Sequence, residues 1–369
     1  MKKVTRLSAL LCALCMLCAL FLTSCGQKGE TAFSYGKAVI TGNMYSYWLS
    51  SGKSEFLRYY NKGRDSDAFW DTVLENGQTA EEYATELICA RVKNYAVSIQ
   101  LFRDMGLTIS SETSQSIEND IAEKIEYYGS RDALNTYLGK MNINIDILHD
   151  IYIAEEKTQA VYNALYGSSG TEAVTGDELD AYYRANYSRI QYILVYTKSE
   201  YVRDADGNLV AGADGTYQVR ELSAEEQAAK ETAVQNILAR LDAGEDFAAV
   251  KKDCDEYAFD TSYYANGFYV SSNELSIYGA PMVTAAADMK EGECRRVDDT
   301  SVTYIMKKEP LTALTSLTDS EKELLSNLSD YCTQEKYQQK MQSLYPDVAV
   351  FSDVISQYSI RTAYPNSLI

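Results

Sequence analysis

The chain has 369 residues, of which 46% are hydrophobic and 24% charged, a composition typical of globular proteins and unlike disordered chains or polytopic membrane proteins. Its formal net charge of −19 argues against sequence-independent nucleic-acid binding, which requires a basic, phosphate-neutralising surface. A single histidine, His149, argues against zinc hydrolases with several histidine ligands and against Ser-His-Asp or Cys-His catalysis, unless that residue is the base.

The first 24 residues are predicted to be a signal peptide. Positions 2, 3 and 6 are basic, and the apolar run from 7 to 22 is too short to be a convincing membrane-spanning helix. The run ends in Leu22-Thr23-Ser24-Cys25, which resembles the lipobox of bacterial lipoproteins, in which the cysteine carries the lipid. The alternative is an ordinary cleaved signal peptide. Because each buried lipid CH₂ contributes about 0.8 kcal/mol, acyl chains on Cys25 would hold the protein at the extracytoplasmic face of the cell membrane.

Residues 25–36 are small and polar and are predicted to be a tether.

Four cysteines follow at wide spacing, with no CxxC pair, so neither a disulfide framework, nor thiol-redox chemistry, nor a thiolate zinc site is predicted. We interpret these residues as buried free thiols, and a pairing of Cys254 with Cys294 stays open. We expect no metal and no cofactor. The four cysteines are Cys89, Cys254, Cys294 and Cys332.

From residue 37 to 170 the hydrophobic pattern is helical. The capping box Thr79-Ala80-Glu81-Glu82 predicts the start of a helix that Gly106 can end. Further helices are predicted around residues 117–128 and 147–165. His149 lies on the last of these, and we interpret it as a satisfied or solvated side chain.

Residues 175–310 are predicted to form a compact α+β module. A second capping box at 175–178 begins a short helix, and residues 190–196 have the pattern of a buried strand. Two Asp-Gly turn signals within 200–222 predict a protruding hairpin; a calcium site is the weaker alternative, because the EF-hand spacing is missing. Two helices are then expected, the second from Phe247, followed by a strand at 267–271, a further helix, and a strand at 302–307.

Residues 311–369 are predicted to be a C-terminal helix and tail. A third capping box, Thr318-Asp319-Ser320-Glu321, opens a long helix that Pro346 ends. The tail 348–354 alternates weakly and is expected to be a final strand or an extended segment. The fold class is therefore α+β, with a helical N-terminal domain and a C-terminal helix on either side of the α+β module in sequence.

This order of parts resembles the SurA/PrsA family of extracytoplasmic foldases. Residues 38–45 are similar to the start of a SurA-type N-terminal domain, and residues 188–309 resemble a parvulin domain. Within the latter, residues 238–250 resemble the family's helix pair, Gly267-Phe268-Tyr269 its Gly-Phe-Phe, and 289–293 its Leu-Lys-x-Gly-Glu turn. The resemblance implies a SurA-like domain at 37–170 and a parvulin-like, rotamase-type domain at 175–310.

The resemblance implies a catalytic cup, from which this sequence departs. Parvulins twist an X-Pro amide, whose uncatalysed rotation needs about 18–20 kcal/mol, above two histidines and a cysteine or aspartate. The matching positions here are Tyr192, Tyr304 and Tyr257, respectively, and Met282 falls near the prolyl-contacting position, with Phe268 beside it. A phenol can donate a hydrogen bond, but its ordinary pKa near 10 makes it unlike an imidazole. Filled-in core aromatics and an altered but working cup both remain open.

Three functions follow as hypotheses. The first is a membrane-anchored extracytoplasmic foldase or chaperone that binds unfolded exported polypeptides in a cradle of both helical regions and the module, with weak or no catalysis; its negative charge would disfavour acidic clients. The second is an active peptidyl-prolyl cis-trans isomerase with a tyrosine-lined pocket. The third is a solute-binding lipoprotein of a transporter, against which the single small α+β module argues. The clients and the oligomeric state, including a homodimer, stay open.

Overall fold

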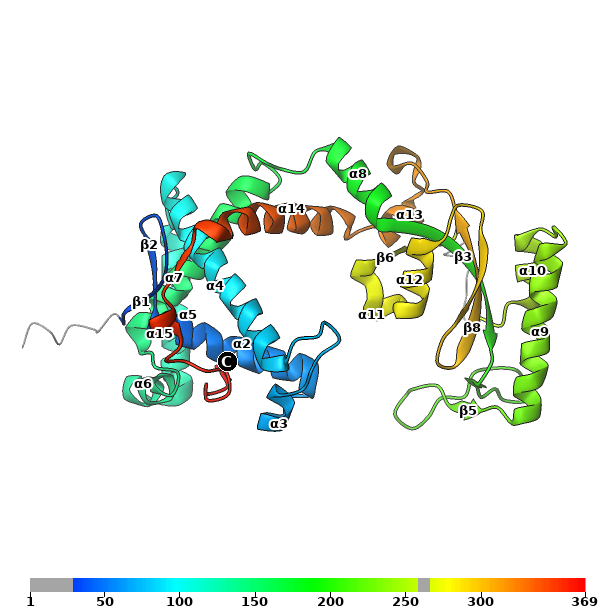
Figure 1. Cartoon of the computed structure of the whole chain (residues 1–369), viewed down its shortest axis with the longest axis horizontal. Helices are drawn as coiled ribbons and strands as arrows, with labels where there is room; N and C mark the ends of the chain where they lie inside the picture. The colour runs from blue at the N-terminus through cyan, green and yellow to red at the C-terminus, as the bar shows by residue number, and fades with distance from the viewer. Residues whose placement is uncertain (1–28, 258–265, 369) are drawn as a thin grey trace, which may run out of the picture. The chain divides into compact units, whose positions relative to one another are not determined.

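The computed structural model describes residues 29–257 and 266–368, so the predicted signal peptide and Cys25 lie outside the described residues. The chain is α+β, as predicted, and divides into two compact units (Figure 1). The helical unit comprises residues 29–173 and 335–368, and the α+β unit comprises residues 174–334. In the described ranges, no helix is long and apolar enough to cross a bilayer.

The helical unit combines six helices of its N-terminal part with a small antiparallel sheet of order β2-β1-β9. The sheet includes residues that were predicted to belong to the tether. Strand β1 begins at Thr31, and its Phe33 side chain is fully buried in the core of the unit. The tether prediction is therefore too long. The elements are β1 (Thr31–Tyr35), β2 (Ala38–Thr41), α2 (Gly42–Asn61), α3 (Asp67–Trp70), α4 (Ala80–Asp104), α5 (Ser111–Tyr128), α6 (Arg131–Gly139), α7 (Ile145–Tyr166), β9 (Ala349–Val350) and α15 (Ser352–Ile355).

Local capping explains where these helices start. The predicted capping box of Thr79 and Glu82 opens α4, with both reciprocal hydrogen bonds present. Helix α6, which the hydrophobic pattern did not separate, begins after Ser130, whose side chain accepts from the backbone N–H of Ala133. The preceding helix ends at Gly129, which adopts a positive φ of 86° that favours glycine.

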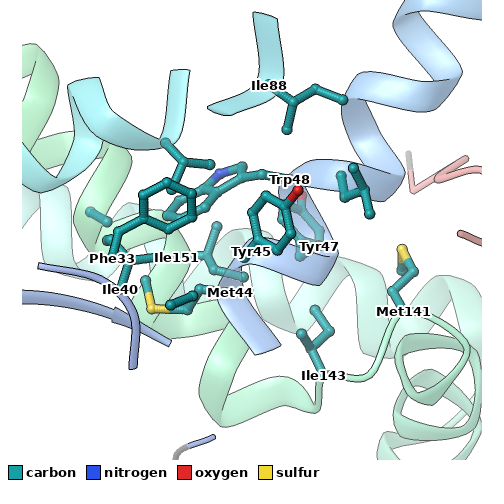
Figure 2. Packing of buried hydrophobic residues seen from close by; sticks show 14 of the residues in the cluster. Phe33, Ile40, Met44, Tyr45, Tyr47, Trp48, Ile88, Met141, Ile143 and Ile151 are labelled. Carbon is teal, nitrogen blue, oxygen red and sulfur yellow. The ribbon is translucent and has the colours of Figure 1, made fainter. Parts of the chain in front are cut away.

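The core of this unit lies between α2, α4 and α7 (Figure 2). Trp48 of α2 stacks on Tyr95 of α4, with ring centroids 4.3 Å apart. Gly52 lets the two helices approach closely, because a Cβ atom there would lie 2.5 Å from Ile88. The tyrosine-rich composition thus supplies part of an ordinary packed core.

A buried lysine ties the C-terminal tail to this core. The Lys53 side chain is 1% exposed, and its Nζ donates to the carbonyl oxygens of Arg361 and Ala363, at 2.8 and 3.0 Å. The same ammonium forms an ion pair with Asp65 at 2.7 Å. The tail is held further by Arg361, which donates to Glu81 at 2.6 Å. A segment about 300 residues away in sequence thereby completes the unit.

We predict that Lys53→Met destabilises the helical unit by about 2–4 kcal/mol, because it leaves two carbonyl oxygens and Asp65 Oδ2 without their donor. Urea unfolding measures the loss, and trypsin should cut faster after Arg361. Lys37→Met, at an exposed position, is the matched control. Equal stability of the two variants would contradict the role given to Lys53.

The α+β unit is built on a four-stranded antiparallel sheet of order β6-β3-β8-β7, covered on both faces. Helices α9 and α10 cover one face, and α12 covers the other (Figure 1). The predicted hairpin is present as β4 and β5. The elements are α8 (Gly176–Asn186), β3 (Tyr187–Tyr196), β4 (Ser199–Tyr201), β5 (Val219–Glu221), α9 (Ala224–Asp242), α10 (Phe247–Cys254), β6 (Phe268–Ser271), α11 (Leu275–Tyr278), α12 (Ala280–Asp288), β7 (Cys294–Asp298), β8 (Val302–Glu309) and α13 (Asp319–Leu324).

The boundary after the α+β unit differs from the predicted one at residue 310. Residues 311–334 belong to this unit, because Tyr269 donates from its hydroxyl to Glu321 at 2.7 Å and Tyr183 donates to the carbonyl oxygen of Thr312. Leu325 and Leu328 pack on the same tyrosines. The predicted long C-terminal helix is therefore two helices, α13 and α14 (Leu328–Leu344), with the turn between them fixed by this packing.

Glu274, after β6, is a buried carboxyl with one oxygen, Oε2, that has no hydrogen-bond partner. Burial raises its pKa from its ordinary 4.5 to about 7. The folded chain therefore binds this proton more tightly than the unfolded chain. The associated stability is complete below the unfolded pKa and is lost as the pH rises through about 7.

We predict that Glu274→Gln raises the melting temperature by several degrees at pH 8 and has little effect at pH 4, because the amide never ionises. Thermal unfolding at a series of pH values measures this. The exposed Glu323→Gln serves as the control and should leave the pH profile unchanged. A pH-independent difference between Glu274→Gln and the native chain would contradict the assignment.

Candidate functional site

Strands β3 and β8 place two of the three predicted tyrosines. Their antiparallel register pairs Leu194 with Tyr304 and Tyr192 with Met306, so the two phenol rings lie diagonally across neighbouring strands. The rings contact each other edge to face with centroids 5.2 Å apart. Side chains alternate along β3, and this puts Tyr192 on the face that α12 covers.

The segment after α10 brings Tyr257 to the same face. The backbone N–H of Leu194 donates to Asp255 Oδ1 at 3.0 Å, and the N–H of Glu256 donates to the Leu194 carbonyl oxygen at 2.9 Å. Lys251 adds a bond from its Nζ to the Tyr192 carbonyl oxygen at 2.6 Å. These contacts fix the chain beside β3, so the Tyr257 ring lies 6.1 Å from the Tyr192 ring.

Phe268 and Met282 join the same cluster, as the sequence positions suggested. Phe268 stacks on Tyr192 with centroids 4.8 Å apart. The preceding residue, Gly267, has a φ of +95°, and a Cβ atom at this position would lie 2.5 Å from the Ile190 carbonyl oxygen, so only glycine fits. Met282 enters from α12, which is the helix expected between the strands at 267–271 and 302–307.

The aromatic cluster is defined by these five residues, of which Tyr192, Phe268 and Met282 are buried and Tyr257 and Tyr304 are partly buried. Tyr192 is 6% exposed, and burial, followed by its neighbours Tyr257 and Tyr304, raises its pKa well above the ordinary range. Burial also raises the pKa of Tyr304. Both phenols therefore keep their protons and can donate hydrogen bonds at neutral pH.

The structure therefore brings together all five predicted site residues of the module, and their role stays a prediction. His149 lies in the other unit, with Nε2 3.4 Å from a carboxylate oxygen of Glu118. Cys254 and Cys294 are free thiols and do not pair with each other. Cys294 is exposed, so the prediction of a buried thiol is wrong at this position. Among the described residues, no group of side chains could hold a metal ion.

The helical unit carries a second candidate site that sequence reasoning missed. A cavity of about 160 Å³ lies between α2 and α4. Its aromatic wall is Phe56 stacked on Tyr60, with centroids 4.4 Å apart, and Tyr59 beside it is 81% exposed. Leu87 of α4 is 45% exposed on the opposite wall. The adjacent Tyr59-Tyr60 pair was the available signal, but helical periodicity alone does not separate an exposed ring from a buried one.

The mouth of this cavity carries one ion pair. Arg91 donates to Glu55 at 2.8 Å, and both side chains are about half exposed. A volume of this size suits one apolar side chain, whereas drug-sized ligands occupy about 300–1,000 Å³. We refer below to the pocket formed by Phe56, Tyr59, Tyr60, Leu87 and their neighbours as the apolar pocket.

Comparison with known proteins gives no match to any family model and no match among curated proteins. Among solved structures, the chain is similar to PrsA from Bacillus subtilis over 80% of its length and 94% of that chain, at 17% identity and a TM-score of 0.23. The chain is also similar to the peptidylprolyl isomerase PrsA from Bacillus cereus, over 79% of its length and 93% of that chain, at 17% identity and a TM-score of 0.29. Its similarity to the foldase protein PrsA from Streptococcus pneumoniae covers 78% of this chain and 97% of that chain, at 16% identity and a TM-score of 0.25. Identities and TM-scores this low transfer no activity or substrate to this chain.

We predict that Tyr192→Ala destabilises the α+β unit by about 3–5 kcal/mol, because it removes a buried ring from a packed cluster. Tyr192→Phe keeps the ring stacked on Phe268 and should cost about 1 kcal/mol or less, the loss of one hydrogen bond. Urea unfolding of both variants distinguishes the contributions. A cost for Tyr192→Phe as large as that for Tyr192→Ala would show that the hydroxyl, not the ring, matters.

Proposed function

We propose that this protein is an extracytoplasmic chaperone of the foldase type, anchored to the membrane through Cys25, that binds apolar segments of unfolded exported polypeptides. The apolar pocket is the observation that carries the proposal. It presents aromatic and aliphatic side chains to solvent at a place where packing within the unit does not require them, which is the mark of an interaction surface.

The chemistry of the apolar pocket favours an unfolded polypeptide. Tyr59 and Tyr60 each offer an apolar ring with a polar tip and few rotatable bonds, so they bind varied side chains at low entropic cost. The single ion pair at the mouth, Glu55 with Arg91, leaves no unpaired charge there to select a charged solute. The net charge of −19 keeps such a surface soluble and favours basic or neutral clients at long range.

The aromatic cluster of the α+β unit supports weak or no isomerase activity as part of the same proposal. Its Tyr192, Phe268 and Tyr304 rings pack against one another and occupy the space in which an X-Pro segment would be twisted. The sequence of this unit contains no histidine, so no imidazole can form a polar floor. The proposal therefore assigns client binding to the apolar pocket and requires no turnover of prolyl bonds by the α+β unit.

We predict that Leu87→Glu weakens suppression of client aggregation by the mature chain (residues 25–369, with Cys25→Ser to remove the lipid). Lost burial of a leucine side chain is worth roughly 1.5–3 kcal/mol, about tenfold or more in affinity. Light scattering of an unfolded client at increasing chaperone ratios measures the effect.

Ile277→Glu is the matched control, because it makes the same change of charge at an exposed apolar residue, 71% accessible, in the other unit. It should suppress aggregation as well as the native chain does. No suppression by the native mature chain at several-fold excess would sink the chaperone proposal. Equal loss in both variants would remove the apolar pocket from it.

A further inference from the structure

The hairpin between β3 and α9 forms one wall of an open, polar cavity that the proposed function does not use. The cavity has a volume of about 550 Å³, within the usual range of ligand sites. Three tyrosine rings line it, from the end of β3, from β4 and from the segment after α10. They are Tyr196, Tyr201 and Tyr257.

Most charges around this hairpin cavity neutralise one another. Arg220 donates to Glu200 at 2.5 Å and to Glu226 at 2.8 Å. Lys230 donates to Glu256 at 2.7 Å, and Glu256 also accepts from the backbone N–H of Tyr196. Such paired groups act as fixed dipoles and hydrogen-bonding partners, not as free cations. They do not favour a phosphate, which requires unpaired positive charge.

Arg203 is the exception among the charged residues that line the cavity. Its Nη1 donates to the carbonyl oxygen of Gly207 at 2.6 Å, and no carboxylate of the described chain pairs with it. Gly207 lies in the first of the two Asp-Gly turns, at a φ of 85°. The turn therefore holds the guanidinium at the cavity while leaving its charge uncompensated.

The cavity is continuous with the aromatic cluster, because Tyr257 belongs to both. Its ring contacts Tyr192 on one side and lines the cavity on the other. A ligand in the cavity thus extends toward an apolar, aromatic surface. An extended peptide has alternating amide groups, which the paired charges of the cavity can match. It also has apolar side chains, which the aromatic surface can contact.

We propose that the hairpin cavity binds an extended polypeptide segment and selects, through Arg203, a carboxylate side chain on it. The inference rests on the proposed function only in taking polypeptides as ligands. The negative charge of the whole chain does not oppose it at contact, because salt screens that field beyond about 8 Å at physiological ionic strength. The charges nearest the bound carboxylate therefore decide its binding, and of those that line the cavity Arg203 is the one without a carboxylate partner in the described chain.

Fluorescence anisotropy with short labelled peptides tests this on the mature chain carrying Cys25→Ser. The peptides share a central phenylalanine and differ at one neighbouring position, which is Glu, Gln or Lys. We expect the Glu peptide to bind about threefold to tenfold more tightly than the Lys peptide. Arg203→Gln should abolish the difference, and Arg203→Glu should reverse it. Lys252→Gln, an exposed position outside the cavity, is the charge-matched control and should preserve the difference.

Equal affinities for the three peptides, or a preference that Arg203→Glu leaves unchanged, would overturn the proposal. So would binding of a neutral oligosaccharide that Arg203→Gln does not alter, with no peptide bound. The Leu87→Glu chain separates the two proposals. The chaperone function fails and the peptide site stands if the Leu87→Glu chain discriminates among the peptides but the native chain suppresses no aggregation. If aggregation is suppressed without discrimination, only the peptide site fails.

Discussion

The burial of strand β3 on both faces is the constraint on which the α+β unit depends. Tyr192 and Leu194 point to the cluster under α12, while Ile193 and Val195 point to α9 and α10. The same strand pairs with β6 along its first half and with β8 along its length. A shift of one residue in this register would exchange the two faces, so the positions of the aromatic cluster and of the helix pair are set together.

The helical unit depends on a different kind of constraint, the return of the C-terminal tail. Lys53 has its ammonium in the core, where an unpaired charge would be costly, and the tail carbonyls supply its partners. The same unit leaves Tyr59 and Leu87 exposed a short distance along α2 and α4. A well-packed core beside the apolar pocket would preorganise the binding that we propose for this pocket.

Features encoded within a few residues were predicted well. The capping boxes at Thr79, Thr175 and Thr318 each open a helix, and the Asp-Gly turns form the hairpin. Features that rest on distant partners were not. β1 was placed in the tether because the burial of Phe33 depends on packing within a unit completed by distant parts of the chain, including β9. Residues 311–334 were placed outside the α+β unit because their contacts with Tyr183 and Tyr269 leave no local pattern.

From residue order alone come the acidic character, the α+β class and the five positions that meet in the aromatic cluster. The acidic character and the fold class follow from composition, period and motif spacing, which are local properties of the chain. The five positions are what the resemblance to parvulin domains implies. The state of that cluster, the apolar pocket and the hairpin cavity with Arg203 come from packing in three dimensions. Whether a tyrosine fills a core, lines a cavity or faces solvent depends on which distant side chains occupy the space around it, and a ring carries no sign of that in its own sequence.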